Sequence, residues 1–136
     1  MKYCNERRRE MANAVITQKG REKMCKSHAG DMVLPKIKYI AYGEGGVDEA
    51  GTPLPVTGEE VSLRNELLRR EVDSHGYPIP TTCEYKSSLG KIELAQKYIS
   101  EVGLFDEEGD LVMYRTFLKK GKDDDMLFDF SIQEIF

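Results

Sequence analysis

The sequence is poor in the residues from which cross-links and metal centres are built. Its 136 residues include three cysteines, two histidines and no tryptophan. The cysteines, Cys4, Cys25 and Cys83, are an odd number at wide spacing, which favours neither a disulfide framework nor a CxxC metal site. We therefore expect reduced thiols, with Cys83 in the core, and neither a metal nor a cofactor.

Long hydrophobic runs are missing as well. No apolar run approaches the roughly 18 residues of a membrane span, and the mean hydropathy is -0.52, so we expect a soluble protein with no membrane contact. The opening MKYCNERRREMANAVITQKG has a basic start but lacks the apolar stretch of a secretory signal, which predicts a chain that begins in the cytoplasm. A length of 136 residues predicts a single domain.

Charge of one sign does not dominate. The net charge is -4, with a basic NERRRE near the start and acidic FDEEGD and GKDDD near the end. The basic residues sit mostly in helix-like segments with acidic neighbours, which argues against a nucleic-acid-binding face. Residues 1–14 carry charge without an apolar period and predict an N-terminal arm, in which Met11 is an alternative start; residues 15–136 predict one domain.

The periodicity of the remaining sequence predicts two helices. The first begins at an N-cap, Thr17, and stops at Gly30, a residue type that suits a helix end. The second covers about residues 58–72. There, Thr57 and Glu60 have the spacing of a capping box, and apolar residues follow at helical intervals.

Alternation of apolar and polar residues predicts strands. It runs through residues 36–42, 83–89 and 126–133, of which the last is the most regular. The prolines and glycines of residues 47–60 predict a surface loop, and residues 74–81 a turn-rich link. The expected fold is therefore α+β, with a mostly antiparallel β-sheet of about four to six strands and two helices.

The segment YISEVGLFDEEGDLVMYRTFLKK, residues 98–120, combines five carboxylates with apolar residues. A calcium-binding loop needs oxygen ligands at alternating positions and a distal glutamate, and DEEGDL offers neither. Apolar residues alternate with others on both sides of the loop, which predicts a β-hairpin with Gly109 at a positive φ. On this interpretation the acids are turn residues kept in water.

Both faces of this hairpin carry large apolar residues. We expect one face to pack on the helices and the other to meet a second sheet, a second copy or a partner chain. At the end of the sequence, no loop follows to cover the last two apolar residues. The candidate interface residues are therefore Val112, Tyr114, Leu118, Ile135 and Phe136.

The catalytic candidates form no recognisable constellation. His28 is expected at a helix end and His75 in a turn, and neither is spaced to pair with a nucleophile. YGEGG lacks the spacing of a phosphate-binding loop, so its glycines predict a turn. Glu66 precedes Arg69 and Arg70 at the spacing of helix-surface ion pairs. The sequence predicts that the protein is not an enzyme.

Four motifs follow one another along the sequence: ITQKGREKM, IAYGEGG, LRNELLRREV, and ISEVGLFDEEGDLV followed by FLKK. In this order and spacing they resemble the N-terminal domain of bacteriophage tail fibre, or tail-collar fibre, proteins. The resemblance covers about residues 14–122. It is carried by Thr17, Gly20, Gly43, Gly45, Gly46, Asn65, Glu66, Arg69, Glu101, Val102, Gly103, Leu104, Phe105, Asp106 and Gly109.

The resemblance implies a non-enzymatic structural protein of a phage or prophage tail, which attaches a tail fibre, or forms its base, at the tail or baseplate. Its partners would be other tail, baseplate or fibre proteins, with a homo-oligomer, favoured as a trimer, and its location the virion tail after assembly in the bacterial cytoplasm. Family members usually continue into a shaft and a receptor-binding tip, whereas this sequence stops at Phe136. An adaptor, a truncated fibre and a prophage remnant all stay open.

A small cytoplasmic ligand- or peptide-binding module is the alternative. Its site would be the YGEGG loop together with the proline-rich loop of residues 47–60. A third reading, a hydrolase that uses His28 or His75 with a nearby cysteine, is disfavoured because no motif brings these residues together.

Overall fold

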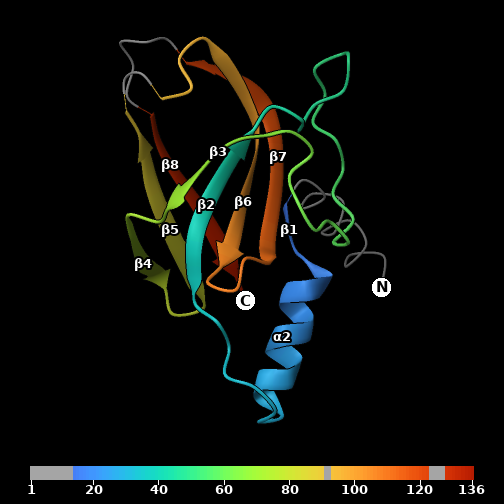
Figure 1. The fold of residues 1–136 in the computed structure, drawn as a ribbon, viewed down its shortest axis with the longest axis vertical. Helices are drawn as coiled ribbons and strands as arrows, with labels where there is room; N and C mark the ends of the chain where they lie inside the picture. Colours follow the sequence, from blue (N-terminus) through green and yellow to red (C-terminus); the bar gives the residue numbers. More distant parts are fainter. Residues whose placement is uncertain (1–13, 91–92, 123–127) are drawn as a thin grey trace.

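The structure, a computed structural model, describes residues 14–90, 93–122 and 128–136 (Figure 1). In this part of the chain, one helix accompanies two antiparallel sheets, of order β1-β7-β6-β2-β3 and β4-β5-β8. The protein is thus mostly antiparallel β with a single described helix. The elements are β1 (Ala14–Ile16), α2 (Gln18–His28), β2 (Ile37–Gly43), β3 (Glu66–Glu71), β4 (Ser74–Ile79), β5 (Thr82–Leu89), β6 (Lys97–Asp106), β7 (Leu111–Lys122) and β8 (Phe128–Ile135).

The two sheets pack against each other across the main hydrophobic core. In Figure 1, β4, β5 and β8 lie beside the five-stranded sheet, and α2 projects beyond one end of it. Both sheets contribute buried apolar side chains to this core, because alternate residues of each strand point inward. Its buried members are Ile40, Tyr42, Leu89, Ile99, Val102, Leu104, Met113 and Ile132.

A second apolar cluster lies on the other side of the β6–β7 hairpin. It is closed by the loop between β2 and β3, from which Leu63 is buried and Val56 packs against it. The buried members are Ala41, Leu63, Phe105, Leu111 and Tyr114.

The predicted β-hairpin is confirmed, and so is the positive φ of Gly109, at 87°. The expectation that its acids stay in water is wrong for Asp106, which is 1% exposed and pairs with Lys23. One of its two apolar faces packs on the second sheet, as one of the expected alternatives. The expectation that helices cover the other face is wrong, because the loop between β2 and β3 covers it. Two of the candidate interface residues lie in this interior, since Val112 is 6% exposed and Tyr114 is 0% exposed. Their assignment to an outer interface is therefore wrong.

The first predicted helix is confirmed as α2. The Oγ1 of Thr17 accepts a hydrogen bond from the backbone N–H of Gly20 at 3.1 Å, and the helix stops before Gly30, whose φ is 85°. The same cap fixes α2 to β7, because the N–H of Thr17 donates to the carbonyl of Val112 at 2.8 Å. No helix in the described ranges combines the length and the hydrophobicity that a bilayer crossing needs.

The second predicted helix, residues 58–72, is wrong. The capping-box contacts do form, since the carboxylate of Glu60 accepts hydrogen bonds from the backbone N–H groups of Thr57 and Gly58. No helix follows them, and Glu66–Glu71 instead forms β3, paired antiparallel with β2. Pairing with a strand distant in sequence overrides the local helical spacing, because short apolar runs suit either structure.

Residues 74–81 were expected to form a link, yet Ser74–Ile79 is strand β4. Its proline, Pro78, is tolerated because β4 lies at the edge of its sheet, and the register with β5 shifts between Gly76 and Ile79. The expected strands at residues 36–42 and 83–89 correspond to β2 and β5, and residues 128–133 of the third lie in β8, while residues 126 and 127 lie outside the described residues. Ala14, the last residue of the expected arm, begins β1; residues 1–13 lie outside the described residues.

We expect Tyr42→Phe to raise the free energy of unfolding by roughly 1 kcal/mol. The Tyr42 hydroxyl is buried near Ser87, but neither hydroxyl makes a hydrogen bond of good geometry among the described residues, so removal of the Tyr42 hydroxyl relieves a desolvation cost. Chemical denaturation of both proteins measures the difference. A loss of stability on this substitution would show instead that the hydroxyl has a bound partner.

Candidate functional site

The carboxylate of Glu101, on β6, is completely buried and fully bonded. The side chain is 0% exposed. Its Oε2 accepts the backbone N–H groups of Gly45 and Asn65, each at 2.8 Å, and its Oε1 accepts the N–H of Arg64 at 2.8 Å and the Tyr114 hydroxyl at 2.6 Å. Four donors compensate the cost of burying this group. Burial and the Glu101 hydrogen bond raise the pKa of the Tyr114 phenol.

The glycines of YGEGG let the loop after β2 lie directly on β6. A Cβ added to Gly43 would lie 2.5 Å from the Glu101 carboxylate, and one added to Gly46 would lie 2.0 Å from the carbonyl oxygen of Ser100. The N–H of Gly46 donates to the Ser100 hydroxyl at 2.8 Å. The place that a ligand's anionic group would take in a glycine loop is therefore filled by Glu101.

A second polar cluster joins α2 to the hairpin turn. The Nζ of Lys23, a residue 6% exposed, lies 2.6 Å from Asp106, 2.8 Å from Glu108 and 2.6 Å from Asp110. The other oxygen of Asp106 accepts the N–H groups of Glu108 and Asp110, each at 3.0 Å, and so shapes the turn. Burial lowers the pKa of Lys23, but the three carboxylates outweigh it and raise the pKa above its ordinary value of 10.5.

The acidic turn also has the composition of a cation site. Ligand atoms of Asp106, Glu108 and Asp110 lie within 4.8 Å of one another. The ammonium group of Lys23 contacts all three, so it occupies the position that a metal ion would take. The turn therefore acts as a clamp for the helix.

The residues that carry the family resemblance gather around these two clusters. Thr17 and Gly20 dock α2 on β7, with the Thr17 hydroxyl donating to the carbonyl of Leu111 at 2.5 Å. Arg69 stacks over Phe105, with its Cζ 3.6 Å from the ring centroid, and pairs with Glu66 at 2.8 Å. Residues from four separate segments thus perform structural tasks around one hairpin.

One predicted ion pair has a different partner. Glu66 pairs with Arg69, but on a strand instead of a helix, and Arg70 pairs with Glu93 at 2.6 Å. The i,i+4 pairing of Glu66 with Arg70 depended on the helix that does not form.

Three of the candidate interface residues are exposed. Leu118 is 67% exposed, Ile135 is 49% exposed and Phe136 is 64% exposed. Leu118 and Ile135 border the same groove, of about 1100 Å³, between β7 and β8. These positions leave large apolar side chains in water, which is typical of contact surfaces.

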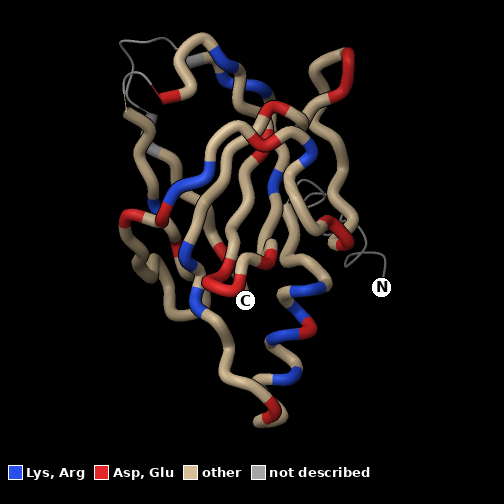
Figure 2. The backbone as a smooth tube through the Cα atoms, in the orientation of Figure 1, with Lys and Arg blue, Asp and Glu red and all other residues tan. Residues whose placement is uncertain are grey.

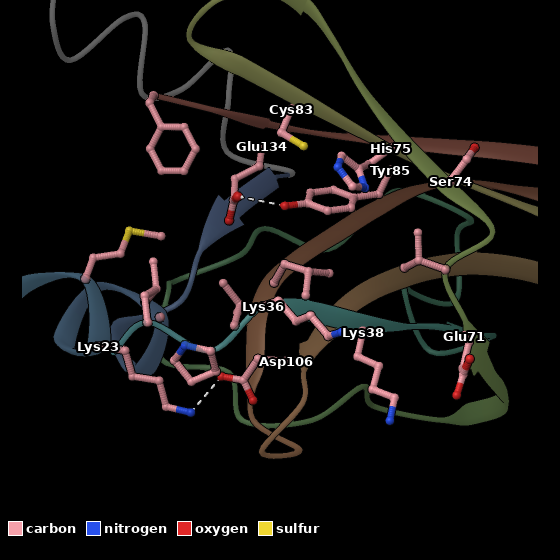
Figure 3. Close-up of a pocket in the computed structure, with 18 of the residues that line it drawn as sticks. Lys23, Lys36, Lys38, Glu71, Ser74, His75, Cys83, Tyr85, Asp106 and Glu134 are labelled. Carbon is pink, nitrogen blue, oxygen red and sulfur yellow. Dashed lines mark hydrogen bonds and ion pairs between the residues drawn. The ribbon is translucent and has the colours of Figure 1, made fainter. Parts of the chain in front are cut away.

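A cavity of about 530 Å³ opens between the two sheets beside α2 (Figure 3). Figure 3 shows Cys83, Tyr85 and Glu134, from β5 and β8, on one wall, with Lys36 and Lys38 opposite. Glu134 is 5% exposed, and its carboxylate accepts only a long hydrogen bond, 3.4 Å, from the Tyr85 hydroxyl within the described ranges. Burial raises the pKa of Glu134, and the Tyr85 hydrogen bond opposes this shift.

The two histidines occupy different places. His28 is the last residue of α2, as expected, whereas His75 lies in strand β4 and not in a turn. His75 and the buried Cys83 both border the cavity. No hydrogen bond joins them in the described part of the chain.

Sequence reasoning missed Glu134 and Lys23. The signal for Glu134 was present, because it continues the inward-facing alternation of Phe130 and Ile132 with a charged residue. Lys23 gave no such signal, since a lysine on a charged helix is usually in water.

Comparison with known proteins gives no assignment: no family model matches the chain, and no curated protein matches it significantly.

We expect Tyr114→Phe to lower the free energy of unfolding by about 1.5 to 3 kcal/mol, because it removes a hydrogen bond to a buried carboxylate. Tyr42→Phe is the matched control, since it removes a buried hydroxyl that has no partner in the described structure. Chemical denaturation measures both. Equal effects of the two substitutions would contradict the role given to Glu101.

We expect Lys23→Met to destabilise the protein by about 3 kcal/mol, because it leaves Asp106 buried without its cation. Lys19→Met, on the exposed side of α2, is the control and should change stability little. Since the pKa of Lys23 is raised by folding, the difference should persist from neutral pH up to about pH 10.5 and shrink above it. Equal stability of the two variants would contradict the claim that Lys23 fixes α2 to the hairpin turn.

Proposed function

We propose that this chain is a non-enzymatic structural protein of a phage or prophage tail, which attaches a tail fibre, or forms its base, at the tail or baseplate. The observation that carries the proposal is the convergence of the family-like motif residues on Glu101 and on the Lys23 clamp. There these residues support a rigid scaffold, as an attachment domain requires. The partners would be other tail, baseplate or fibre proteins, and the location the virion tail.

The surface is consistent with assembly. Leu118, Ile135 and Phe136 leave apolar side chains exposed on β7 and at the end of β8. Basic and acidic segments are interleaved along the sheets and the helix (Figure 2), unlike the continuous basic stripe that nucleic acid attracts. These features favour protein partners, including further copies of the chain, of which we propose a trimer.

A small ligand- or peptide-binding module is the second candidate function. The glycine loop proposed for its site is packed on Glu101, so that location loses its support. The cavity between the sheets favours this function instead, because it is of ligand size and holds a buried carboxyl group.

The proposal is tested by light scattering over a range of concentrations, together with binding to the tail and fibre proteins encoded beside this chain. We expect a defined oligomer, favoured as a trimer, whose mass falls when Leu118→Asp and Ile135→Asp place charges on the exposed apolar surface. Val33→Asp is the control, since Val33 is 91% exposed in the segment after α2.

A chain that stays monomeric at every concentration and binds none of those tail proteins would contradict the proposal and leave the binding module. If Val33→Asp disrupts the oligomer as strongly as the two other substitutions do, the assignment of Leu118 and Ile135 to the contact surface is contradicted.

A further inference from the structure

The three-stranded sheet changes character along its inner face. Near Leu89 and Ile132 this face belongs to the main hydrophobic core. Towards the cavity it carries Cys83, Tyr85 and Glu134 instead. Inner-face positions of a sandwich are normally apolar, so a glutamate that is 5% exposed needs a physical explanation.

Aromatic side chains lead from the surface to this glutamate. His75 pairs across the strands with Tyr85, and their ring centroids are 6.1 Å apart. Tyr77, two residues along β4, lies 6.0 Å from His75 and is 69% exposed. Because Cys83 pairs with Glu134 on the other side of β5, the carboxyl group lies diagonally from Tyr85. The rings form a path whose inner end is the carboxyl group.

The charged side chains that line the cavity are three lysines and four acids, so one negative charge is in excess. Lys23 and Asp106 pair with each other. Lys36 and Lys38 equal Glu71 and Asp73 in number, which leaves Glu134. The deep end of the cavity therefore carries one negative charge whenever Glu134 is ionised.

Glu134 is also short of hydrogen bonds. A buried carboxylate normally accepts several donors, as Glu101 does, but Glu134 has a single bond of 3.4 Å among the described residues. A donor that enters the cavity would complete its hydrogen bonding. An anion would be repelled, and a metal ion would find one carboxylate where it needs several oxygen ligands.

We propose that this cavity binds an organic cation, a protonated amine or guanidinium with an apolar body, whose charged group pairs with Glu134 and whose body lies against Tyr85 and His75. Aromatic faces attract cations, and the volume of about 530 Å³ suits a small organic molecule. The cation comes either from a free small amine or from a lysine or arginine side chain that a partner protein inserts. The site does not depend on the tail role.

The first experiment compares two probes of equal shape, 2-phenylethylamine and the neutral 2-phenylethanol, by NMR titration of the full chain. We expect the amine to bind at least about tenfold more tightly than the alcohol, with shifts confined to the residues that line the cavity. Glu134→Gln should remove this preference. Glu84→Gln is the matched control, because Glu84 lies on the opposite face of β5 and pairs with Gln133 and Lys86.

The Glu134→Gln protein is expected to fold, since burial disfavours the ionised glutamate. Its melting temperature at pH 7 should be at least equal to that of the parent protein. Tyr85→Leu gives an independent test, because it removes the aromatic ring and keeps the carboxyl group of Glu134. This substitution should weaken the binding of the amine. Equal binding of amine and alcohol, no binding of either at millimolar concentration, or equal effects of Glu134→Gln and Glu84→Gln would overturn the proposal.

A third probe, the peptide Gly-Gly-Lys-Gly-Gly with blocked ends, distinguishes the two possible sources of the cation. Binding of the free amine alone indicates a small-molecule ligand, whereas binding of the peptide indicates an inserted side chain. Both results support the cation site. Because the readout is independent of oligomeric mass, the site and the tail-assembly proposal can fail separately.

Discussion

The arrangement of this fold depends on one buried carboxylate. Removing an ionised group from water is expensive unless hydrogen bonds replace its hydration, and Glu101 obtains four donors from three separate parts of the chain. Those donors are backbone N–H groups of the loops around Gly45 and Asn65, and the hydroxyl of Tyr114. Because losing any donor leaves charge partly unpaired, the loops cannot move away from β6 without a large cost. The requirement for glycine at positions 43, 45 and 46 follows from the same close approach.

The Lys23 clamp extends this principle to the helix. α2 makes few apolar contacts of its own, and its buried residues are Gly20 and Lys23. It is held by the Thr17 cap on β7 and by an ammonium group placed among three carboxylates. Asp106 serves both ends, since one of its oxygens shapes the hairpin turn and the other binds the helix. Helix position and turn conformation are therefore coupled through one side chain.

Local sequence patterns predicted the elements whose stabilising features, such as a cap or a turn glycine, lie within the element itself. α2 has its cap, β5 and β8 have their alternation, and the hairpin has Gly109, so each was identified from its own residues. The helix expected at residues 58–72 failed because a capping box is only a local hydrogen-bond pattern, whereas β3 is decided by pairing with β2. β4 was hidden by Pro78, which only an edge position allows.

Local sequence patterns also failed to predict the buried charges of the candidate site. From the sequence alone, surface positions are expected for Glu101, Lys23 and Asp106, because their partners lie far away along the chain. The resemblance pointed to two of them, Glu101 and Asp106, without giving their tasks. Glu134 differs: its inward position on β8 could be predicted from the alternation, but its role depends on a cavity that five other segments line.

The two buried glutamates of this protein have opposite environments, and the contrast bears on function. Glu101 is saturated with donors and can accept no ligand without losing part of the fold. Glu134 is equally hidden from bulk water, yet it has one long hydrogen bond and faces a cavity, so its burial favours the neutral form. A scaffold that needed only rigidity would be better served by an apolar residue at that position, in phase with Phe130 and Ile132. The carboxyl group is explained if its remaining hydrogen bonds come from a molecule that enters the cavity.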